Sequence, residues 1–355
     1  MFQPWKIRRY SINQGRHINS GRSGSHKQDK NKMTISLVTD YEHGISAIDA
    51  QFHRPRRAAI HLIVENGKMA LVDTGTSSSI AGVINAIEEK NLSAEDVAYI
   101  ILTHIHLDHA GGASECMRRF PNARLVVHPR GARHMADPEK LVAGAIAVYG
   151  KAEFERVYGE IHPIDKQRII EAPDQSRIEL NGRTLLFIDT PGHARHHNCI
   201  YDEQSNAFFT GDTFGVSYRE FDVNGMEFVF PTTTPIQFDP SAAHTSLDRI
   251  MGFNPKYAFV THYGRIGHLH RHAEAMHTLI DAHVKIARSA KTGMHSNRGR
   301  FETISSALQS LLLQCIREHG CRLPETEIIA LISSDIKLNT QGLEHWLDQV
   351  DQIRA

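Results

Sequence analysis

One short stretch of the chain, residues 103–112, carries three histidines and an aspartate within six positions, directly after an apolar run. Such a run is typical of a buried strand in a parallel sheet. His104 and His106 are two residues apart on its extended continuation, so their side chains point to the same side. Asp108 and His109 follow where the chain turns into a helix. Imidazole nitrogen and carboxylate oxygen suit zinc or iron, so the stretch predicts a metal site, and four such groups this close can serve two ions.

The abundance of histidine offers an alternative explanation for this cluster. The chain has 24 histidines in 355 residues, so several of them could fall together by chance. A buried strand end crowded with unpartnered polar groups, however, carries a desolvation cost unless something binds those groups. We therefore interpret the cluster as metal ligands.

Three more candidate ligands follow apolar runs further along the chain. His193 comes after a Pro-Gly turn, which exposes its side chain. Asp212 lies in a Gly-Asp-Thr segment at the end of a second run, where a carboxylate can bridge two cations, and His262 ends a third run. Each residue is a weak signal alone, but together they predict one site built from several strand ends.

This order of motifs resembles the metallo-β-lactamase superfamily, over about residues 60–264. The resemblance implies a metal site between two β-sheets, at which Asp73 in Leu-Val-Asp-Thr-Gly supports the histidine loop without binding metal. It implies that the first metal's ligands are His104, His106 and His193, that the second's are Asp108, His109 and His262, and that Asp212 bridges the two. All seven positions are present, which argues for an enzyme.

The remaining pattern fits an α/β fold, an αββα metallo-β-lactamase sandwich with a C-terminal helical appendage. The pairs Asn66-Gly67 and Asn181-Gly182 each separate two strand-like runs and predict hairpins with two-residue turns. Apolar residues at helical spacing predict helices at residues 77–90, 141–158, 267–291, 301–319, 325–335 and 341–353. We expect a catalytic domain over residues 33–266 and a helical region over residues 267–355.

Residues 1–32 differ from the rest of the chain, because they are rich in Lys, Arg, Ser, Gly and Asn. They contain no apolar stretch of the kind that a secretory signal needs. We interpret them as a disordered basic extension, with a transit-like or nucleic-acid-binding arm as the alternative.

Composition limits the partners of the chain. Lys+Arg and Asp+Glu both total 40, so no global basic field recruits nucleic acid. Four cysteines without a Cys-x-x-Cys pair fit a reducing, cytoplasmic compartment. No apolar run is long enough to span a bilayer. We therefore expect a small-molecule substrate, no nucleic acid, no membrane, and leave a homo-oligomer open.

The ligand set predicts the chemistry. Two cations that share a water lower its pKa to near neutrality and supply a hydroxide that attacks an electrophilic carbonyl. Zinc is the default metal, with iron or manganese as alternatives, and Asp108 and Asp212 would position the nucleophile. The motifs resemble the glyoxalase II-like and lactonase-like branch, which implies hydrolysis of a small thioester, ester or lactone.

The substrate-binding residues are less well determined. The segment 214–238 is rich in aromatic residues and carries Arg219, so it either forms a substrate wall for an acyl compound with an acid group or packs onto the sandwich. Tyr263 and Arg265 follow His262, and Tyr263 could donate to an oxyanion. The histidines of the next helix are interpreted as a partly solvated surface rather than a second metal site: His268, His270, His272, His277 and His283.

Two other activities fit similar motifs. An iron-dependent sulfur dioxygenase of this superfamily would use His104, His193 and Asp212, and iron accepts these ligands as readily as zinc. A nucleic-acid phosphodiesterase would need a phosphate-binding surface, and only residues 1–32 are basic. A flavodiiron role fits less well, because that branch usually has a glutamate where this chain has His106.

Overall fold

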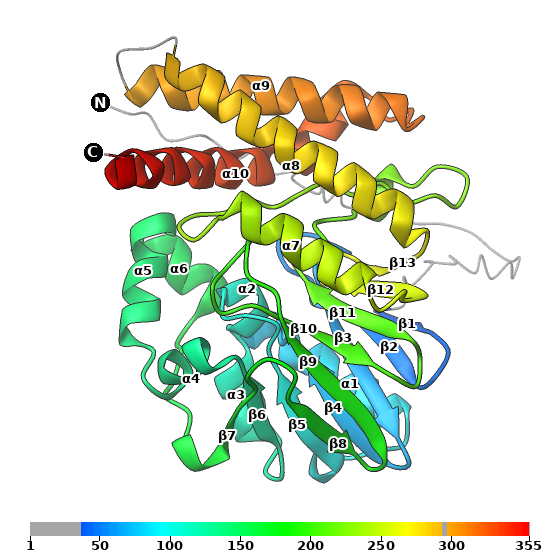
Figure 1. The fold of residues 1–355 in the computed structure, drawn as a ribbon. Coiled ribbons are helices and arrows are strands. Elements are labelled where there is room, and N and C mark those ends of the chain that lie inside the picture. The colour runs from blue at the N-terminus through cyan, green and yellow to red at the C-terminus, as the bar shows by residue number, and fades with distance from the viewer. Residues whose placement is uncertain (1–36, 293–296, 355) are drawn as a thin grey trace, which may run out of the picture. The chain divides into compact units, whose positions relative to one another are not determined.

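Two β-sheets packed face to face form the centre of the protein (Figure 1). The computed structural model describes residues 37–292 and 297–354, so the extension expected over residues 1–32 lies outside the described residues. The seven-stranded sheet contains, in order, β1 (Val38–Asp40), β2 (Ile45–Asp49), β3 (Ala59–Glu65), β4 (Lys68–Val72), β5 (Val97–Ile101), β6 (Arg124–Val127) and β7 (Ile169–Glu171). The six-stranded sheet contains, in order, β13 (Gly264–Ile266), β12 (Tyr257–Val260), β11 (Ala207–Gly211), β10 (Asn198–Asp202), β9 (Arg183–Asp189) and β8 (Arg177–Leu180).

Each sheet combines antiparallel and parallel pairs. In the first sheet β5 lies between β4 and β6 and is parallel to both, as the sequence predicts for the strand before His104. In the second sheet β11 is parallel to β12, and the other neighbours are antiparallel. The strands that precede the predicted ligands His104, Asp212 and His262 therefore each have a parallel neighbour.

Alternate residues of the strands fill the space between the sheets. Ile63, Val72 and Ile101 of the first sheet share a hydrophobic cluster with Phe187 and Phe209 of the second. Burying a side chain of this size contributes about 1.5–3 kcal/mol. The period-2 alternation of the strands thus fixes which residues face the other sheet.

Helices cover both outer faces of the pair of sheets, which confirms the αββα arrangement (Figure 1). The first sheet is covered by α1 (Ile80–Glu89), α2 (Leu107–Ala110), α3 (Ala113–Arg119), α4 (Pro129–Ala136), α5 (Glu139–Tyr149) and α6 (Lys151–Tyr158). The second is covered by α7 (Pro240–Met251), α8 (Leu269–Thr292), α9 (Asn297–Glu318) and α10 (Glu325–Arg354).

Both predicted hairpins are confirmed. Asn66 and Gly67 connect β3 to β4, and Asn181 and Gly182 connect β8 to β9, all four with positive φ angles between 45° and 98°. Positive φ at both central residues is what a type I′ turn requires. The two turns also touch, since each asparagine side chain donates to the other's backbone carbonyl, at 3.4 and 2.7 Å.

Two helix predictions are wrong in their continuity. The helix expected over residues 141–158 is divided into α5 and α6 at Gly150, whose φ of 83° is outside the helical range. The two helices expected over residues 325–335 and 341–353 are one helix, α10. The expected gap contains Asn339, whose side chain bonds the backbone of Pro231 and Thr233, and Thr340, whose hydroxyl donates to the Ile336 carbonyl.

The C-terminal helices belong to the same hydrophobic core as the second sheet. Leu308 and Ile316 of α9 and Ile332 and Leu343 of α10 are buried in the cluster that contains Phe208 of β11. Gly342 lets α10 approach the chain closely, because a Cβ atom there would lie 1.6 Å from the Thr233 carbonyl oxygen. No helix within the described residues is long and apolar enough to cross a membrane.

Candidate metal centre

Five segments bring all seven predicted ligands to one place. The segments are the chain after β5 (His104, His106), α2 (Asp108, His109), the β9–β10 loop (His193), the end of β11 (Asp212) and the end of β12 (His262). Their ligand atoms form three overlapping groups, in each of which all atoms lie within 4.8 Å of one another: His104, His106 and His193; His104, His109 and Asp212; Asp108, His109 and His262.

Three imidazoles make up the first group. The Nδ1 atom of His106 lies 2.9 Å from Nε2 of His104 and 2.9 Å from Nε2 of His193. Burial, together with the neighbouring imidazoles, holds the pKa of His104 and His106 well below 6.5. Burial also lowers the pKa of His193. The three rings are therefore neutral at pH 7 and keep the lone pair that a metal ligand needs.

Asp212, a member of the second group, lies between the other two. Its Oδ2 atom lies 3.5 Å from Nε2 of His193 in the first group, whereas its Oδ1 atom lies 3.3 Å from Nε2 of His109 and 3.6 Å from Nε2 of His262, both in the third group. Asp108 also belongs to the third group, with Oδ2 3.3 Å from Nε2 of His262. Each oxygen of Asp212 thus faces a different group, as a bridging carboxylate requires.

The residues fit a divalent metal site. Nε2 of His109 and Oδ1 of Asp212 are buried without a hydrogen-bond partner, although both are strong polar groups. Burial lowers the pKa of His109 and His262, but the carboxylates of Asp212 and Asp108 outweigh it and raise both values above 6.5. These two histidines hold their protons because carboxylates surround them. A metal cation can replace the protons, since it also balances the carboxylate charge.

A further carboxylate, Asp73, holds the loop in place, as the sequence resemblance implied. It is fully buried and accepts hydrogen bonds from the Thr103 backbone N–H (2.9 Å), the Thr103 hydroxyl (2.9 Å) and the Thr261 hydroxyl (2.8 Å). Nδ1 of His109 lies 2.7 Å from the second Asp73 oxygen. This contact directs Nε2 of His109 toward the metal centre.

Backbone and hydroxyl groups orient two other ligands. Nδ1 of His262 donates to the Arg57 carbonyl at 2.8 Å, and Nδ1 of His104 lies 3.1 Å from the Thr103 hydroxyl. In both rings Nε2 is left to face the centre. Partners of this kind fix the tautomer and the ring plane of a metal ligand.

His197, which was not among the predicted site residues, supports Asp212. Its buried Nε2 accepts the Asp212 backbone N–H at 3.2 Å, and its ring stacks on His104 with 4.8 Å between centroids. Nδ1 lies 3.0 Å from the Thr190 hydroxyl, which leaves Nε2 as the acceptor. Gly211 makes room for this contact, since a Cβ there would lie 2.6 Å from Nε2 of His197. The sequence signal for it is the pair His196-His197, which begins four residues after the Pro191-Gly192 turn.

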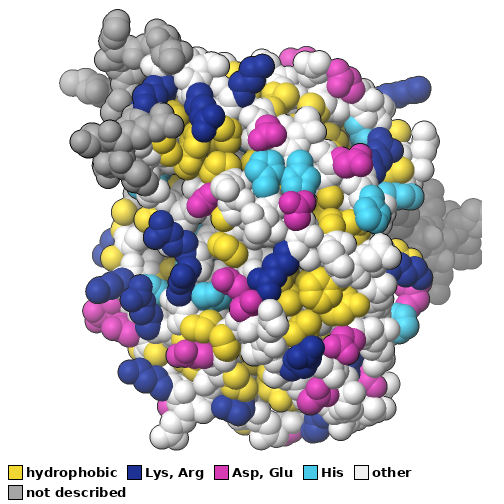
Figure 2. All heavy atoms as spheres, viewed as in Figure 1, with side chains coloured by type: hydrophobic (Ala, Val, Ile, Leu, Met, Phe, Trp, Pro, Cys, Tyr) yellow, Lys and Arg dark blue, Asp and Glu magenta, His cyan; other side chains and the backbone are white. Residues whose placement is uncertain are grey.

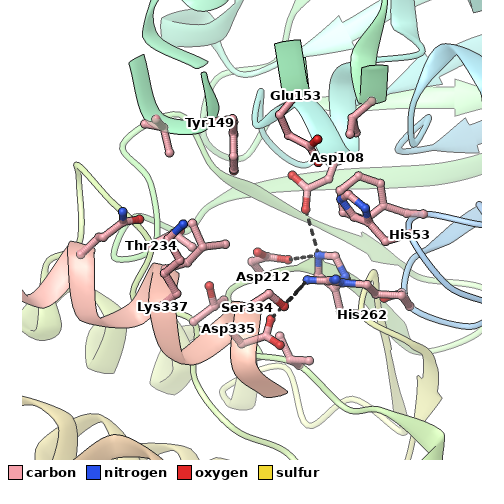
Figure 3. A pocket seen from close by; sticks show the side chains of 18 of the residues that line it. His53, Asp108, Tyr149, Glu153, Asp212, Thr234, His262, Ser334, Asp335 and Lys337 are labelled. Atoms are coloured by element: carbon pink, nitrogen blue, oxygen red, sulfur yellow. Dashed lines mark hydrogen bonds and ion pairs between the residues drawn. The ribbon is translucent and has the colours of Figure 1, made fainter. Parts of the chain in front are cut away.

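A cavity of about 410 Å³ opens over the centre. Asp108, Asp212 and His262 line it, and Figure 3 shows them between α5–α6 on one side and α10 on the other. Three segments supply the walls: the β2–β3 loop (Phe52, His53, Arg57), α5–α6 (Val148, Tyr149, Glu153, Val157, Tyr158) and α10 (Ser334, Asp335, Lys337, Leu338, Gln341).

Of the two alternatives for the aromatic segment 214–238, the structure shows the second: the segment packs onto the sandwich and does not form a substrate wall. Its six aromatic residues are all buried in the core shared with the C-terminal helices: Phe214, Tyr218, Phe221, Phe228, Phe230 and Phe238. Arg219 donates to the Ser217 backbone and pairs with Asp222, so it is not the cation of the cavity. Val216, Thr232 and Thr234 are the residues of this segment that reach the cavity.

The structure does not bring Tyr263 or Arg265 to the cavity either. The Tyr263 ring packs with Ala47 and Ala59 in a separate small cluster, because the chain turns away from the centre directly after His262. The Arg265 guanidinium lies over the Tyr257 ring and pairs with Glu42. The phenols that line the cavity are Tyr149 and Tyr158.

The histidines of α8 form no three-ligand group within the described residues. His268, just before α8, and His270 are exposed, whereas His272 and His283 are buried, which agrees with the predicted partly solvated surface. His277 stacks on His244 of α7, and Figure 2 shows histidine side chains on the face where α7 and α8 lie. Lys, Arg, Asp and Glu are interspersed on that face.

Comparison with known proteins shows the family. The model described as "Metallo-beta-lactamase superfamily" matches residues 53–262, more than half of the chain. The chain belongs to this superfamily, whose members are mostly hydrolases. It carries the histidine and aspartate groups for a divalent metal site.

Several relatives share this region. The chain is 29% identical to the metallo-beta-lactamase fold-containing protein ST1585 of Sulfurisphaera tokodaii, over 63% of this chain and 78% of that protein. It is 31% identical to a hydroxyacylglutathione hydrolase of Klebsiella pneumoniae, over 42% of this chain and 43% of the relative. An atrochrysone carboxyl ACP thioesterase of Aspergillus fumigatus is 31% identical over 33% of this chain and 27% of the relative. The match thus spans less than half the length of the last two.

Solved structures agree on the fold. The metallo-beta-lactamase family protein TTHA1429 of Thermus thermophilus superposes with a TM-score of 0.61 at 20% identity, covering 87% of this chain and 94% of that one. The crystal structure of ST1585 gives a TM-score of 0.56 at 24% identity, covering 85% and 98%. Both coverages extend beyond the region that the family model matches.

Proposed function

We propose that this protein is a dinuclear metallohydrolase that cleaves a small thioester, with esters and lactones as related substrates and zinc as its metal. The observation that carries the proposal is the arrangement of Asp212, whose two oxygens face two groups of histidines at the floor of a substrate-sized cavity. Two relatives named hydroxyacylglutathione hydrolase and ACP thioesterase support the thioester class.

The ligands prepare the site for attack on a carbonyl. When bound, two divalent cations would supply an activated water and polarise the carbonyl oxygen. Burial raises the pKa of Asp108, but His109 and His262 outweigh it and hold the value well below 3.8. Asp108 therefore stays ionised, and it orients a water by accepting a hydrogen bond rather than by removing a proton.

The leaving group also favours a thioester. A thiol has a pKa near 8.5 and leaves as the thiolate without a proton, whereas an alkoxide is a much stronger base and requires one. A thioester therefore makes the smaller demand on the groups that line the cavity, among which Tyr149 and Tyr158 are phenols.

The first experiment measures metal content and turnover on one sample purified without added metal. Two zinc ions per chain with hydrolysis of a thioester and lactone panel would support the proposal. One iron, inert esters and oxygen uptake with a persulfide would instead indicate the sulfur dioxygenase.

Two substitutions test the ligand assignment. We expect His106→Ala and Asp212→Ala to lose metal and at least 100-fold in turnover, since each removes a ligand. His270→Ala, at an exposed position of α8, serves as the matched control and should retain both. Full metal load and turnover in either ligand variant would refute the assignment.

The absence of nucleic-acid and membrane partners, the oligomeric state and the cytoplasmic location stay predictions.

A further inference from the structure

Arg57 is a cation on the wall of the cavity whose charge is only partly compensated. Its side chain is 15% exposed, and its Nη2 atom donates to the Ser334 hydroxyl at 2.7 Å. The carboxylate that faces it, Asp335, lies 4.0 Å away, beyond hydrogen-bond distance. That carboxylate is already engaged by the Tyr218 hydroxyl, at 3.1 and 3.2 Å from its two oxygens.

The Arg57 guanidinium also lies 5.6 Å from the centroid of the Phe52 ring, and the Tyr218 hydroxyl favours its charged form, but neither contact supplies a carboxylate for its fork of donors. The group has five N–H donors in a planar fork, and burying such a charge is costly unless it is paired. The geometry that satisfies the fork best is a carboxylate bound through two parallel hydrogen bonds.

The position of Arg57 relates it directly to the reaction centre. Its own carbonyl oxygen accepts the hydrogen bond from Nδ1 of His262, so its backbone lies against a metal ligand while its side chain lines the cavity. Phe52, Tyr158 and Leu338 provide apolar surface on the same cavity. A short chain of methylene groups could therefore lie between the reacting carbonyl and the guanidinium.

We propose that this cavity is a subsite for an acyl group that ends in a carboxylate, with Arg57 as the residue that receives it, so that the preferred substrates are thioesters of short dicarboxylic acids. The proposal rests on the proposed thioester hydrolysis and names its substrate class. It assigns to Arg57 the role that the substrate-wall alternative gave to Arg219; Lys337, also on the cavity wall, is exposed, whereas Arg57 is largely buried.

The competing explanation is that Arg57 only ties the β2–β3 loop to α10 through Ser334. The two roles differ in what they predict for uncharged substrates. A tether affects every substrate alike, because its loss moves the wall. A carboxylate receptor affects the acidic substrates alone.

Kinetics on matched substrates test the proposal with the full, zinc-loaded chain. Glutaryl and valeryl thioesters of one thiol differ in the terminal carboxylate, and kcat/KM is measured for each. We expect the wild type to prefer the glutaryl thioester, and Arg57→Gln to lose about 10- to 100-fold on it, with less than about 3-fold on the valeryl thioester. Arg57→Lys should fall between, because an ammonium keeps the charge but not the fork.

Arg56→Gln is the matched control, since Arg56 carries the same charge on the same loop but is exposed and is not among the residues that line the cavity. It should leave the glutaryl to valeryl ratio unchanged. Metal content is measured in every variant, because the Arg57 backbone contacts His262. Equal losses on both thioesters in Arg57→Gln, or a wild type without preference for the acid, would overturn the proposal.

A binding measurement separates failure of this proposal from failure of the proposed function. Glutarate should raise the melting temperature of the zinc-loaded wild type more than valerate does, and Arg57→Gln should abolish the difference. If this result holds while no thioester is cleaved, the carboxylate subsite stands and the hydrolase assignment fails. If thioesters are cleaved but glutarate and valerate act alike on both proteins, the subsite is wrong and the hydrolase stands.

Discussion

Replacement of Asp73 by asparagine should weaken both the fold and the metal centre. The carboxylate accepts hydrogen bonds on both oxygens, from Thr103 on one and from His109 and Thr261 on the other. An amide group turns one acceptor into a donor, so in either orientation about two of these contacts are lost. Hydrogen bonds to a charged group contribute roughly 1.5–3 kcal/mol each, which gives a loss of about 3–6 kcal/mol.

A loss of that size is a large part of a typical unfolding free energy of about 5–15 kcal/mol. Urea unfolding of the metal-free protein measures it, and zinc titration should show an affinity about 10- to 100-fold lower, since His109 loses its orienting partner. Asp40→Asn is the control, because the Asp40 side chain is 68% exposed and its ion pair with Lys90 contributes less than about 1 kcal/mol. If Asp73→Asn unfolds within about 1 kcal/mol of the wild type and binds zinc as tightly, the supporting role of Asp73 is refuted.

Three further perturbations have defined outcomes. Removing divalent cations with a chelator should stop thioester cleavage. Adding zinc back at about 1,000 times its Kd should raise the unfolding free energy by about 4 kcal/mol. A melting temperature that zinc does not change would contradict the metal site. Burial holds the pKa of His61 at about 4, so between pH 6.5 and pH 4 the unfolded chain binds a proton that the folded chain does not. Stability should therefore fall with acid, by about 2 kcal/mol at pH 5 from this residue, and His61→Phe should show a smaller loss in urea midpoint between pH 7 and pH 5. Gly342→Ala places a Cβ 1.6 Å from the Thr233 carbonyl oxygen and should lower the unfolding free energy by about 3 kcal/mol or more, as measured by thermal unfolding. Gly144→Ala in α5 is the control: its Cβ meets no atom within 4 Å, so it should be neutral or stabilising.

The metal centre could be predicted from the sequence because its ligands follow strands. His104, Asp212 and His262 each come directly after a buried apolar run, and neighbouring parallel strands place their carboxyl ends together. The pattern of apolar residues thus carries information about three-dimensional proximity. The Asn-Gly turns were equally predictable, since positive φ at two successive positions limits the residues that fit.

The cavity walls could not be predicted, because burial does not distinguish a core from a pocket. Phe221 and Phe230 belong to a segment rich in aromatic residues, as a substrate wall could be, yet they are buried in the core shared with α9 and α10. The continuity of α10 was hidden for a related reason. Asn339 disfavours a helix locally, and it is the contact of its side chain with Pro231 and Thr233 that offsets this preference.

The relatives share the metal centre but not every wall of the cavity, and this limits what they can say about the substrate. The family match ends at residue 262, so it contains every metal ligand but none of the α10 residues that line the cavity. A relative that shares only this region shares the metal ligands and the walls that the β2–β3 loop and α5–α6 form, but not the wall that α10 forms. The substrate of this protein must therefore be inferred from the cavity itself, where Arg57 lies within the matched region and its partner Ser334 lies outside it.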